Sequence, residues 1–248
     1  MTRPRALHLR RVYDRLADLL PPTAASRLDW WAHARSRGPN RSFNDQQGRR
    51  QIVAELVSTI DFTCALETGS YRGSSTLMLA ELIHAAVASV ECRARNQLFA
   101  SRRLEPYPHA SSELGDSRQF LERRLTGGSG PAFVYLDAHW YDDLPLADEL
   151  RIIGNSGRQA VVMIDDFRVD DDPGYGYDDY GPGKALDSTY LSSVPEILGW
   201  TRFVPSLASS RETGARRGCV VVVHPQLAAV VEGLPSLRRS TDGENPLL

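Results

Sequence analysis

Short apolar runs alternate with longer stretches of helical periodicity along the middle of the chain. Runs rich in β-forming residues predict strands at 63–67, 86–91, 110–114, 132–137 and 160–165. The stretches between them have apolar residues at helical spacing and predict helices at 74–84, 93–104, 117–125 and 146–153. This alternation predicts an α/β fold, with helices on both faces of a sheet. Two more runs, 201–204 and 219–224, lack a convincing helix between them and predict an antiparallel edge pair, giving a seven-stranded, mostly parallel sheet.

The regions that flank this core predict a different organisation. Residues 1–60 predict an N-terminal helical cap, with an amphipathic helix at 5–20 that ends at Pro21 and a short helix at 26–36. Asn44 or Asp45 is expected to cap a third helix that runs to about Ile60. The core then covers 61–225, and 226–248 is expected to be a C-terminal tail. The first helix is expected to pack on the core, although exchange of this helix in a homodimer is also open.

A segment rich in glycine, tyrosine and aspartate interrupts the core at 168–190, after the fifth predicted strand. It is too long to be a simple connection. Its glycines provide hinge freedom and its tyrosines could cover a ring, so we interpret it as an insertion that forms a lid. A solvated acidic loop is the alternative.

Composition excludes several functional classes. The 248 residues have a formal net charge of -2, so no global basic field favours nucleic acid or an anionic membrane as a partner. No apolar run approaches the roughly 20 residues that a membrane-spanning helix needs. Cys64, Cys92 and Cys219 follow no metal-ligand spacing. A reducing, cytoplasmic setting accounts for these features.

Acidic residues fall at the ends of the first five predicted strands. They are Glu67, Glu91, Asp116, Asp137 and the pair Asp165-Asp166. In an open parallel sheet, ligands bind beyond the carboxyl ends of the strands. We therefore expect these carboxylates to gather along one rim and to form a ligand site.

The loop after the first strand is the predicted cofactor site. Its glycines follow a G-x-x-x-G pattern instead of the G-x-G-x-x-G of dinucleotide sites, and an acid precedes them. Such a loop suits a cationic ligand, such as the aminoacyl and sulfonium ends of S-adenosylmethionine (SAM), and it opens a helix whose free N–H groups can bind. Glu91 has the spacing of an acid that binds a ribose diol. Asp116 either binds an adenine amine or caps the next helix. The predicted cofactor-binding residues are Glu67, Gly69, Ser70, Tyr71, Gly73, Ser75, Glu91, Asp116 and Asp137.

The fourth and fifth strands carry the predicted metal site. Apolar residues immediately precede Asp137, Asp165 and Asp166, so these side chains are expected to emerge from the core at the rim. Three carboxylates from neighbouring strands suit a hard divalent cation such as Mg²⁺. Aspartates that cap turns are the structural alternative.

Residues 63–168 resemble metal-dependent class I SAM-dependent O-methyltransferases, most closely the macrocin and aminocoumarin sugar O-methyltransferase type and more distantly catechol O-methyltransferase. The resemblance rests on the Glu67-Thr68-Gly69 loop, Glu91, the Asp137-x-His139-Trp140-Tyr141 motif and the Asp165-Asp166 pair. It implies a Rossmann-like fold, SAM as cofactor, Asp137, Asp165 and Asp166 as metal ligands, and His139 as catalytic base. Relatives often have Asp at the position of His139, and the lysine that catechol-type enzymes place after the metal Asp is missing here.

The expected function is therefore methyl transfer from SAM to a hydroxyl of a small molecule, which is a sugar, a phenol or another natural product. His139 would remove the hydroxyl proton near neutral pH, or it is a rim histidine bonded to Asp142 or Asp143. Alternative functions are a hydroxylase-associated or non-catalytic SAM-binding protein of the same fold, and a glycosyltransferase.

Overall fold

The computed structural model describes residues 13, 16–32, 39–139 and 143–241. Its strands are β1 (Cys64–Thr68), β2 (Ala86–Glu91), β3 (Ala110–Leu114), β4 (Ala132–Leu136), β5 (Ala160–Asp165), β6 (Thr201–Pro205), β7 (Cys219–Val223) and β8 (Leu237–Arg239). Its α-helices are α2 (Pro22–Ala32), α3 (Gln47–Thr59), α4 (Ser74–Leu82), α5 (Ala94–Leu104), α6 (Ser117–Leu125), α7 (Leu146–Asn155), α8 (Ser188–Ser192) and α9 (Pro225–Glu232). Short 3₁₀ segments lie at Pro39–Asp45, Pro195–Ile197 and Ser209–Arg211.

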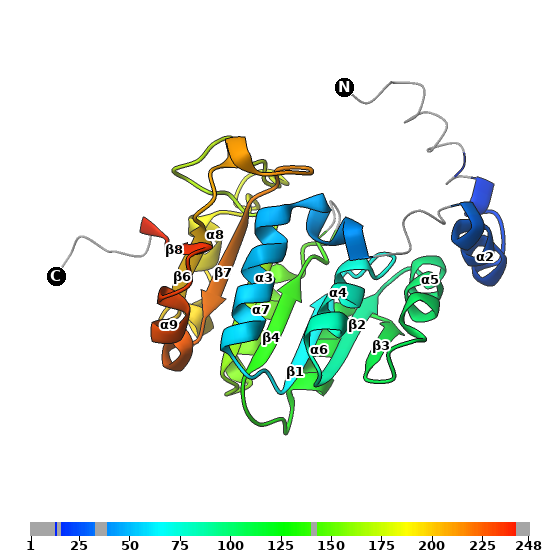
Figure 1. Ribbon diagram of the computed structural model, residues 1–248, viewed down its shortest axis with the longest axis horizontal. Coiled ribbons are helices and arrows are strands. Elements are labelled where there is room, and N and C mark those ends of the chain that lie inside the picture. The colour runs from blue at the N-terminus through cyan, green and yellow to red at the C-terminus, as the bar shows by residue number, and fades with distance from the viewer. Residues whose placement is uncertain (1–12, 14–15, 33–38, 140–142, 242–248) are drawn as a thin grey trace.

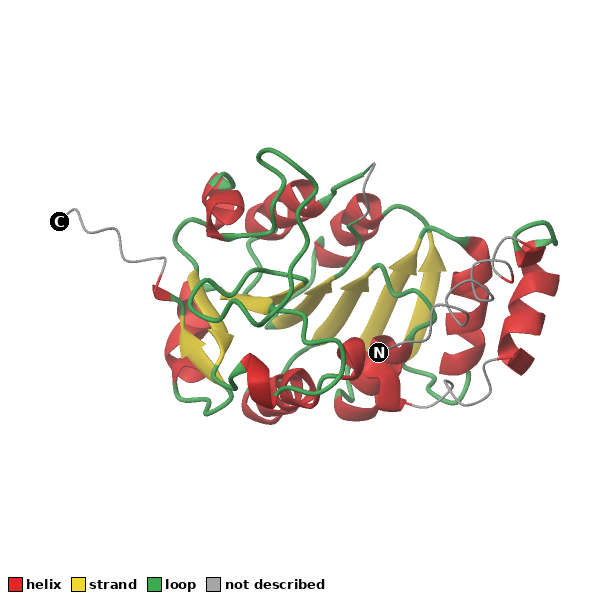
Figure 2. Ribbon diagram, turned by 90° about the horizontal axis from the view of Figure 1, so that it is seen from above, coloured by secondary structure: helices red, strands yellow, loops and turns green. Residues whose placement is uncertain are grey.

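The strands form one sheet in the order β3-β2-β1-β4-β5-β7-β6-β8. Strands β1 to β5 pair in parallel, so their carboxyl ends share one edge. Alternate residues of β4 face opposite layers: Phe133 and Tyr135 pack with α3, α4 and α9, whereas Val134 and Leu136 pack with α6, α7 and α8. Burial on both faces explains why the central strands are continuous apolar runs. Figure 2 shows these helices on both sides of the sheet, and the predicted α/β fold is confirmed.

The antiparallel edge is larger than the sequence predicts. Strand β7 pairs with β5 and β6, as the expected antiparallel pair requires, but β8 adds an eighth strand beyond β6. The predicted count of seven strands is therefore wrong. Strand β8 has the sequence Leu-Arg-Arg, in which only Leu237 is deeply buried, so hydrophobic alternation does not reveal it. Helix α9 and β8 both lie in the segment that we expected to be a tail.

The N-terminal elements begin elsewhere than expected. The predicted helix at 5–20 lies mostly outside the described residues, and the predicted helix at 26–36 is α2, which starts earlier, at Pro22. Helix α2 lies beyond α5 at the β3 edge of the sheet (Figure 1). The Trp30 and Phe99 ring centroids lie 5.1 Å apart in this contact. Neither Asn44 nor Asp45 caps α3, because the N-cap is Gln46 and no side chain bonds there. The Asn44 amide instead donates to Asp165 Oδ2 at 3.1 Å.

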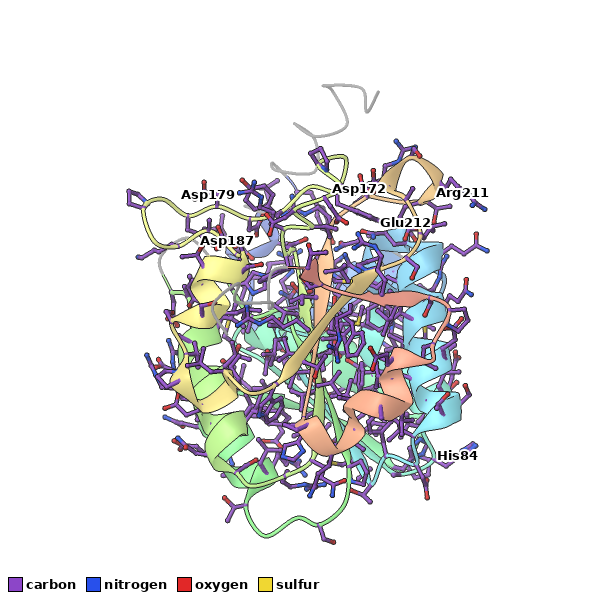
Figure 3. All side chains as sticks on the ribbon, turned by 90° about the vertical axis from the view of Figure 1, so that its left-hand side faces the viewer. His84, Asp172, Asp179, Asp187, Arg211 and Glu212 are labelled. Atoms are coloured by element: carbon purple, nitrogen blue, oxygen red, sulfur yellow. The ribbon has the colours of Figure 1, made fainter. Side chains whose placement is uncertain are left out.

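The segment 168–190 is docked on the core by backbone hydrogen bonds. Asp178 N donates to Asp166 O at 2.9 Å and Gly218 N donates to Gly176 O at 2.7 Å, while Leu186 N donates to Asp178 O at 2.9 Å within the segment. Tyr175 and Leu186 are buried within it. Figure 3 shows Asp172 and Asp179 of this segment at one end of the molecule and His84, which precedes β2, at the opposite end. The segment therefore covers the carboxyl ends of the parallel strands, and its opening as a lid stays a prediction.

Within the described part of the chain, none of the helices combines the length and the apolar character that crossing a lipid bilayer requires.

Candidate active site at the carboxyl ends of the strands

The loop between β1 and α4 passes unusually close to the end of β4. Gly69 has a φ of +72°, and a Cβ atom placed on it would overlap the Asp137 carbonyl and lie 2.7 Å from Ala138 Cα. Gly69 N and Ser70 N both donate to Val90 O, at 3.0 and 3.2 Å, which ties the loop to β2. Only glycine combines this backbone conformation with so close an approach. The predicted role of Gly69 as the tight point of the loop agrees with this geometry.

Glu67, at the end of β1, is bonded to the helix that follows this loop. Its carboxylate is buried, and its two oxygens accept hydrogen bonds from the hydroxyls of Ser75 and Thr76 in the first turn of α4. Burial raises the pKa of Glu67 to about 7, although the two hydroxyl donors act in the opposite direction. Glu67 does not line the three clefts described below, so its contacts hold the loop against α4.

Glu91, at the end of β2, fixes the other side of the loop. Its Oε2 accepts from Tyr71 N at 2.8 Å and its Oε1 accepts from Arg93 N at 2.9 Å. Tyr71 has a φ of +47°, a conformation that non-glycine residues seldom adopt and that tends to occur at functional sites. The hydrogen bond from its own N–H to Glu91 helps to maintain this conformation.

Three clefts meet at Gly69. The largest has a volume of about 880 Å³ and runs from Glu91 past Asp137 to Tyr180. A second, of about 500 Å³, lies along the loop and includes Ser70 and Ser75. A third, of about 310 Å³, lies between the ends of β2 and β3 and is lined by Val90, Gly115 and Asp116 among others.

The position of Asp116 is compatible with both of its predicted roles. Its side chain caps α6 by accepting from Arg118 N and Gln119 N, at 3.0 and 3.2 Å. The same residue lines the 310 Å³ cleft, which Glu91 also borders. The sequence left these alternatives open, and the structure is compatible with both.

The ends of β4 and β5 bring together Asp137, His139 and Asp166. Among the described residues, these three form the group that could hold a metal ion, with one ligand atom from each within 4.8 Å of the others. We call this group the acidic centre. It differs from the predicted metal set, because His139 takes the place of Asp165.

Strand alternation explains why Asp165 points elsewhere. Asp165 follows Met163 in the two-residue repeat, so its side chain faces α3. There it forms a buried ion pair with Arg49 and accepts hydrogen bonds from Asn44 and from Tyr135 Oη, the latter at 2.6 Å. Asp166, by contrast, has a φ of +52° and lies beside Asp137. The carboxylate of Asp165 is therefore engaged in the core, and that of Asp166 belongs to the acidic centre.

Burial and mutual repulsion act on both carboxylates of the acidic centre. Burial, together with the charges of Asp165, Asp166 and Glu67, holds the pKa of Asp137 well above its usual value. Burial and Asp165 raise the pKa of Asp166 to about 6, although Arg217 opposes them. A bound cation would relieve the repulsion between these groups.

His139 is buried beside these carboxylates, with 7% of its surface exposed. Within the described part of the chain, neither of its ring nitrogens has a hydrogen-bond partner. Burial lowers its pKa, against the opposite influence of Asp165 and Asp178, so the ring is neutral near pH 7. Asp143 pairs with Arg118 and not with His139, while Trp140, Tyr141 and Asp142 lie outside the described residues.

Sequence reasoning missed the residues that surround the acidic centre. Arg217 Nε donates to Asp166 Oδ1 at 2.6 Å, and its guanidinium also pairs with Asp178. Tyr180 Oη donates to Asp178 Oδ2 at 2.5 Å, and the Tyr180 ring lies 6.4 Å from the His139 ring. Arg217 belongs to no motif, and Asp178 was assigned only to the insertion. No sequence signal identifies either of them as a neighbour of Asp166.

Comparison with known proteins identifies the fold. No protein-family model matches the chain, and neither does any curated protein. A SAM-dependent methyltransferase from Aquifex aeolicus is similar in structure, with a TM-score of 0.51 and 12% identity over 82% of this chain and 97% of that one. The O-methyltransferase TomG from Streptomyces achromogenes, in complex with SAM, has a TM-score of 0.49 and 17% identity over 71% of this chain and 78% of that one. The N-methyltransferase NodS from Bradyrhizobium japonicum has a TM-score of 0.48 and 15% identity over 71% and 92% of the two chains.

The likeness to the Aquifex aeolicus structure means that this chain has the fold of a SAM-dependent methyltransferase. At 12% identity it says nothing about the acceptor or about a metal. Those questions depend on the side chains at the carboxyl ends of the strands.

Proposed function

We propose that this protein transfers a methyl group from SAM to a hydroxyl group of a small molecule, with a divalent cation at the acidic centre. The observation that carries this proposal is a buried histidine whose ring lies within 4.8 Å of two carboxylates, in the cleft that Gly69 also borders. Such a group can bind a cation and accept a proton in the same place.

The clefts around Gly69 fit SAM. Gly69 borders all three clefts and carries no side chain, so a ligand could approach the loop backbone there. Glu91 would accept hydrogen bonds from the ribose diol, and the 310 Å³ cleft beside Asp116 would hold the adenine. When bound, SAM supplies an electrophilic methyl group. Ser70, Tyr71 and Ser75 border the cleft that would receive its aminoacyl end.

A divalent cation fits the acidic centre by charge and by donor type. Oxygens of Asp137 and Asp166 would hold a hard cation such as Mg²⁺ or Mn²⁺, which leaves the nearby His139 ring free to act as a base. When bound, the cation would lower the pKa of an acceptor hydroxyl by Lewis-acid polarisation. Arg217 holds Asp166 in position from the other side.

His139 is the proposed general base. Its ring is neutral near pH 7 and has no competing hydrogen bond among the described residues, so a ring nitrogen can take the hydroxyl proton. Tyr180, whose ring lies edge-on to His139, limits the directions from which an acceptor can approach.

The charges that line the largest cleft favour an uncharged acceptor. Its lining has two more acidic side chains than basic ones. One divalent cation would therefore bring the net charge of the lining close to zero. A sugar or phenol hydroxyl suits such a cleft better than a strongly anionic group. The acidic residues are Asp18, Glu91, Asp137, Asp166 and Asp178, and the basic ones are Arg72, Arg93 and Arg95.

Three free cysteines are compatible with a reducing, cytoplasmic setting.

Calorimetric titration with SAM and with MgCl₂ or MnCl₂ tests the two binding steps separately. Turnover is then measured as S-adenosylhomocysteine released with a panel of neutral sugars and catechols. His139→Ala is expected to lower kcat by about 10²- to 10⁴-fold, while the SAM Kd changes less than two-fold. His84→Ala, at the opposite end of the sheet, is the matched control (Figure 3). Wild-type turnover by His139→Ala would remove His139 from the mechanism. SAM binding without turnover on any acceptor would favour a non-catalytic SAM-binding protein.

A further inference from the structure

The N-terminal region forms one side of the largest cleft. Ala17, Leu20, Pro22 and Ala25 line it opposite the acidic centre, together with Asp18. We call residues 16–32 the N-terminal wall. Its contribution is mostly apolar and small, so an acceptor held between the two sides would present oxygens to Asp137 and Asp166 and a less polar surface to the wall.

A single buried carboxylate connects this wall to the cofactor loop. Asp29, on α2, is fully buried. Its oxygens accept from Arg95 Nε and Nη2, both at 2.7 Å, in a two-pronged pair. Asp29 also pairs with Arg72 at 2.9 Å and accepts from Tyr13 Oη at 2.8 Å. Charge-assisted bonds of this kind fix geometry more strictly than single neutral bonds do.

Both arginine partners belong to segments that would hold the cofactor. Arg72 lies in the Gly69 to Gly73 loop, directly after Tyr71, and its backbone oxygen accepts from Arg103 Nη1 at 2.7 Å. The Arg72 guanidinium lies 5.1 Å from the Tyr71 ring centroid. Arg95 lies in the first turn of α5, four residues after Glu91. Displacement of Asp29 would therefore release Arg72 of the loop and Arg95 of α5, which both line the largest cleft.

We infer that Asp29 is a positioning residue that couples closure of the N-terminal wall to SAM binding. The inference rests on the proposed function. SAM bound beside Tyr71 and Arg72 would hold Arg72 in its pair with Asp29, so the cofactor would stabilise the wall in the position that lines the acceptor cleft. Because such coupling is reciprocal, docking of the wall also strengthens SAM binding by the same factor.

The test combines SAM calorimetry with hydrogen–deuterium exchange of the full-length protein. In the wild type, SAM is expected to slow amide exchange across 16–32 at least five-fold. Asp29→Asn is expected to weaken SAM binding about ten-fold and to abolish that protection, while SAM still protects the peptide that contains Glu91. Glu232→Gln removes an exposed ion pair with Arg239 at the opposite edge of the sheet and is the isosteric control. It should leave both readouts unchanged.

A second variant separates coupling from loss of fold. Arg72→Gln is expected to weaken SAM binding, and the double variant Asp29→Asn/Arg72→Gln to weaken it by less than the product of the two single losses, because the Asp29–Arg72 contact contributes to both. Additive losses, or equal protection of 16–32 by SAM in Asp29→Asn and in the wild type, would overturn the inference. A wild type that binds no SAM would overturn the proposed function as well. If the wild type binds SAM and Asp29→Asn binds it with the same affinity, only the coupling is overturned.

Discussion

Replacement of Gly69 by alanine probes the contact on which the cofactor site depends. The added methyl group would overlap the Asp137 carbonyl and lie 2.7 Å from Ala138 Cα, and the backbone would keep a φ of +72°. Gly157→Ala is a matched control, because Gly157 has a φ of +69° and no atom within 4 Å of a Cβ placed on it. The two variants therefore share the conformational cost and differ in the steric one.

The magnitudes follow from these two costs. A left-handed conformation costs a non-glycine residue about 1–2 kcal/mol. A methyl group forced into a closely packed site costs about 1–3 kcal/mol more. Gly157→Ala is therefore expected to lose about 1–2 kcal/mol of unfolding free energy, and Gly69→Ala about 2–5 kcal/mol. The overlap of the added methyl group can be relieved only if the loop moves away from β4. Gly69→Ala should therefore also weaken SAM binding, and Gly157→Ala should not.

Urea unfolding of both variants, followed by circular dichroism, measures the free energies, and calorimetry at a temperature where both are folded measures SAM affinity. The m-value should stay constant, so that the midpoint reports stability. Equal destabilisation of the two variants would mean that Gly69 does not approach β4 as closely as we describe, and the reasoning would be refuted.

Two more predictions follow from buried carboxyl groups. Burial raises the pKa of Glu149 to about 7 from its usual 4.5, so the unfolded chain releases this proton first and the folded protein loses up to about 3 kcal/mol of stability as pH rises through that window. The glutamine of Glu149→Gln does not titrate, so the unfolding free energy of this variant relative to the wild type should increase between pH 5 and pH 8 in urea unfolding. The same free-energy difference between variant and wild type at both pH values would contradict this. Asp165→Asn should cost about 3–5 kcal/mol, because it leaves Arg49 buried without its partner, but it should change Mn²⁺ affinity much less than Asp166→Asn, which should weaken it at least ten-fold. If calorimetry shows that the two variants lose Mn²⁺ affinity equally, Asp165 is a metal ligand after all.

The sequence alone determined the central layers of this protein. The apolar runs of β4 and β5 could be identified because strands buried on both faces need hydrophobic residues at every position. The acids that end these runs could be assigned to one rim, because parallel strands share the direction of their carboxyl ends. Glu91 and Asp137 line the largest cleft at this rim, whereas Glu67, which is buried beneath the loop, does not line the three clefts.

Only the tertiary structure decided which of the adjacent acids Asp165 and Asp166 belongs to the acidic centre. Arg49, which pairs with Asp165, lies 116 residues away in the sequence, and Arg217, which pairs with Asp166, lies 51 residues away. The link from Asp29 to Arg72 and Arg95 and the pairing of β8 also join distant segments. Local periodicity reports which face of an element is buried. The ion-pair partner of a charged side chain, however, often comes from a distant segment, so the sequence around that side chain does not reveal it.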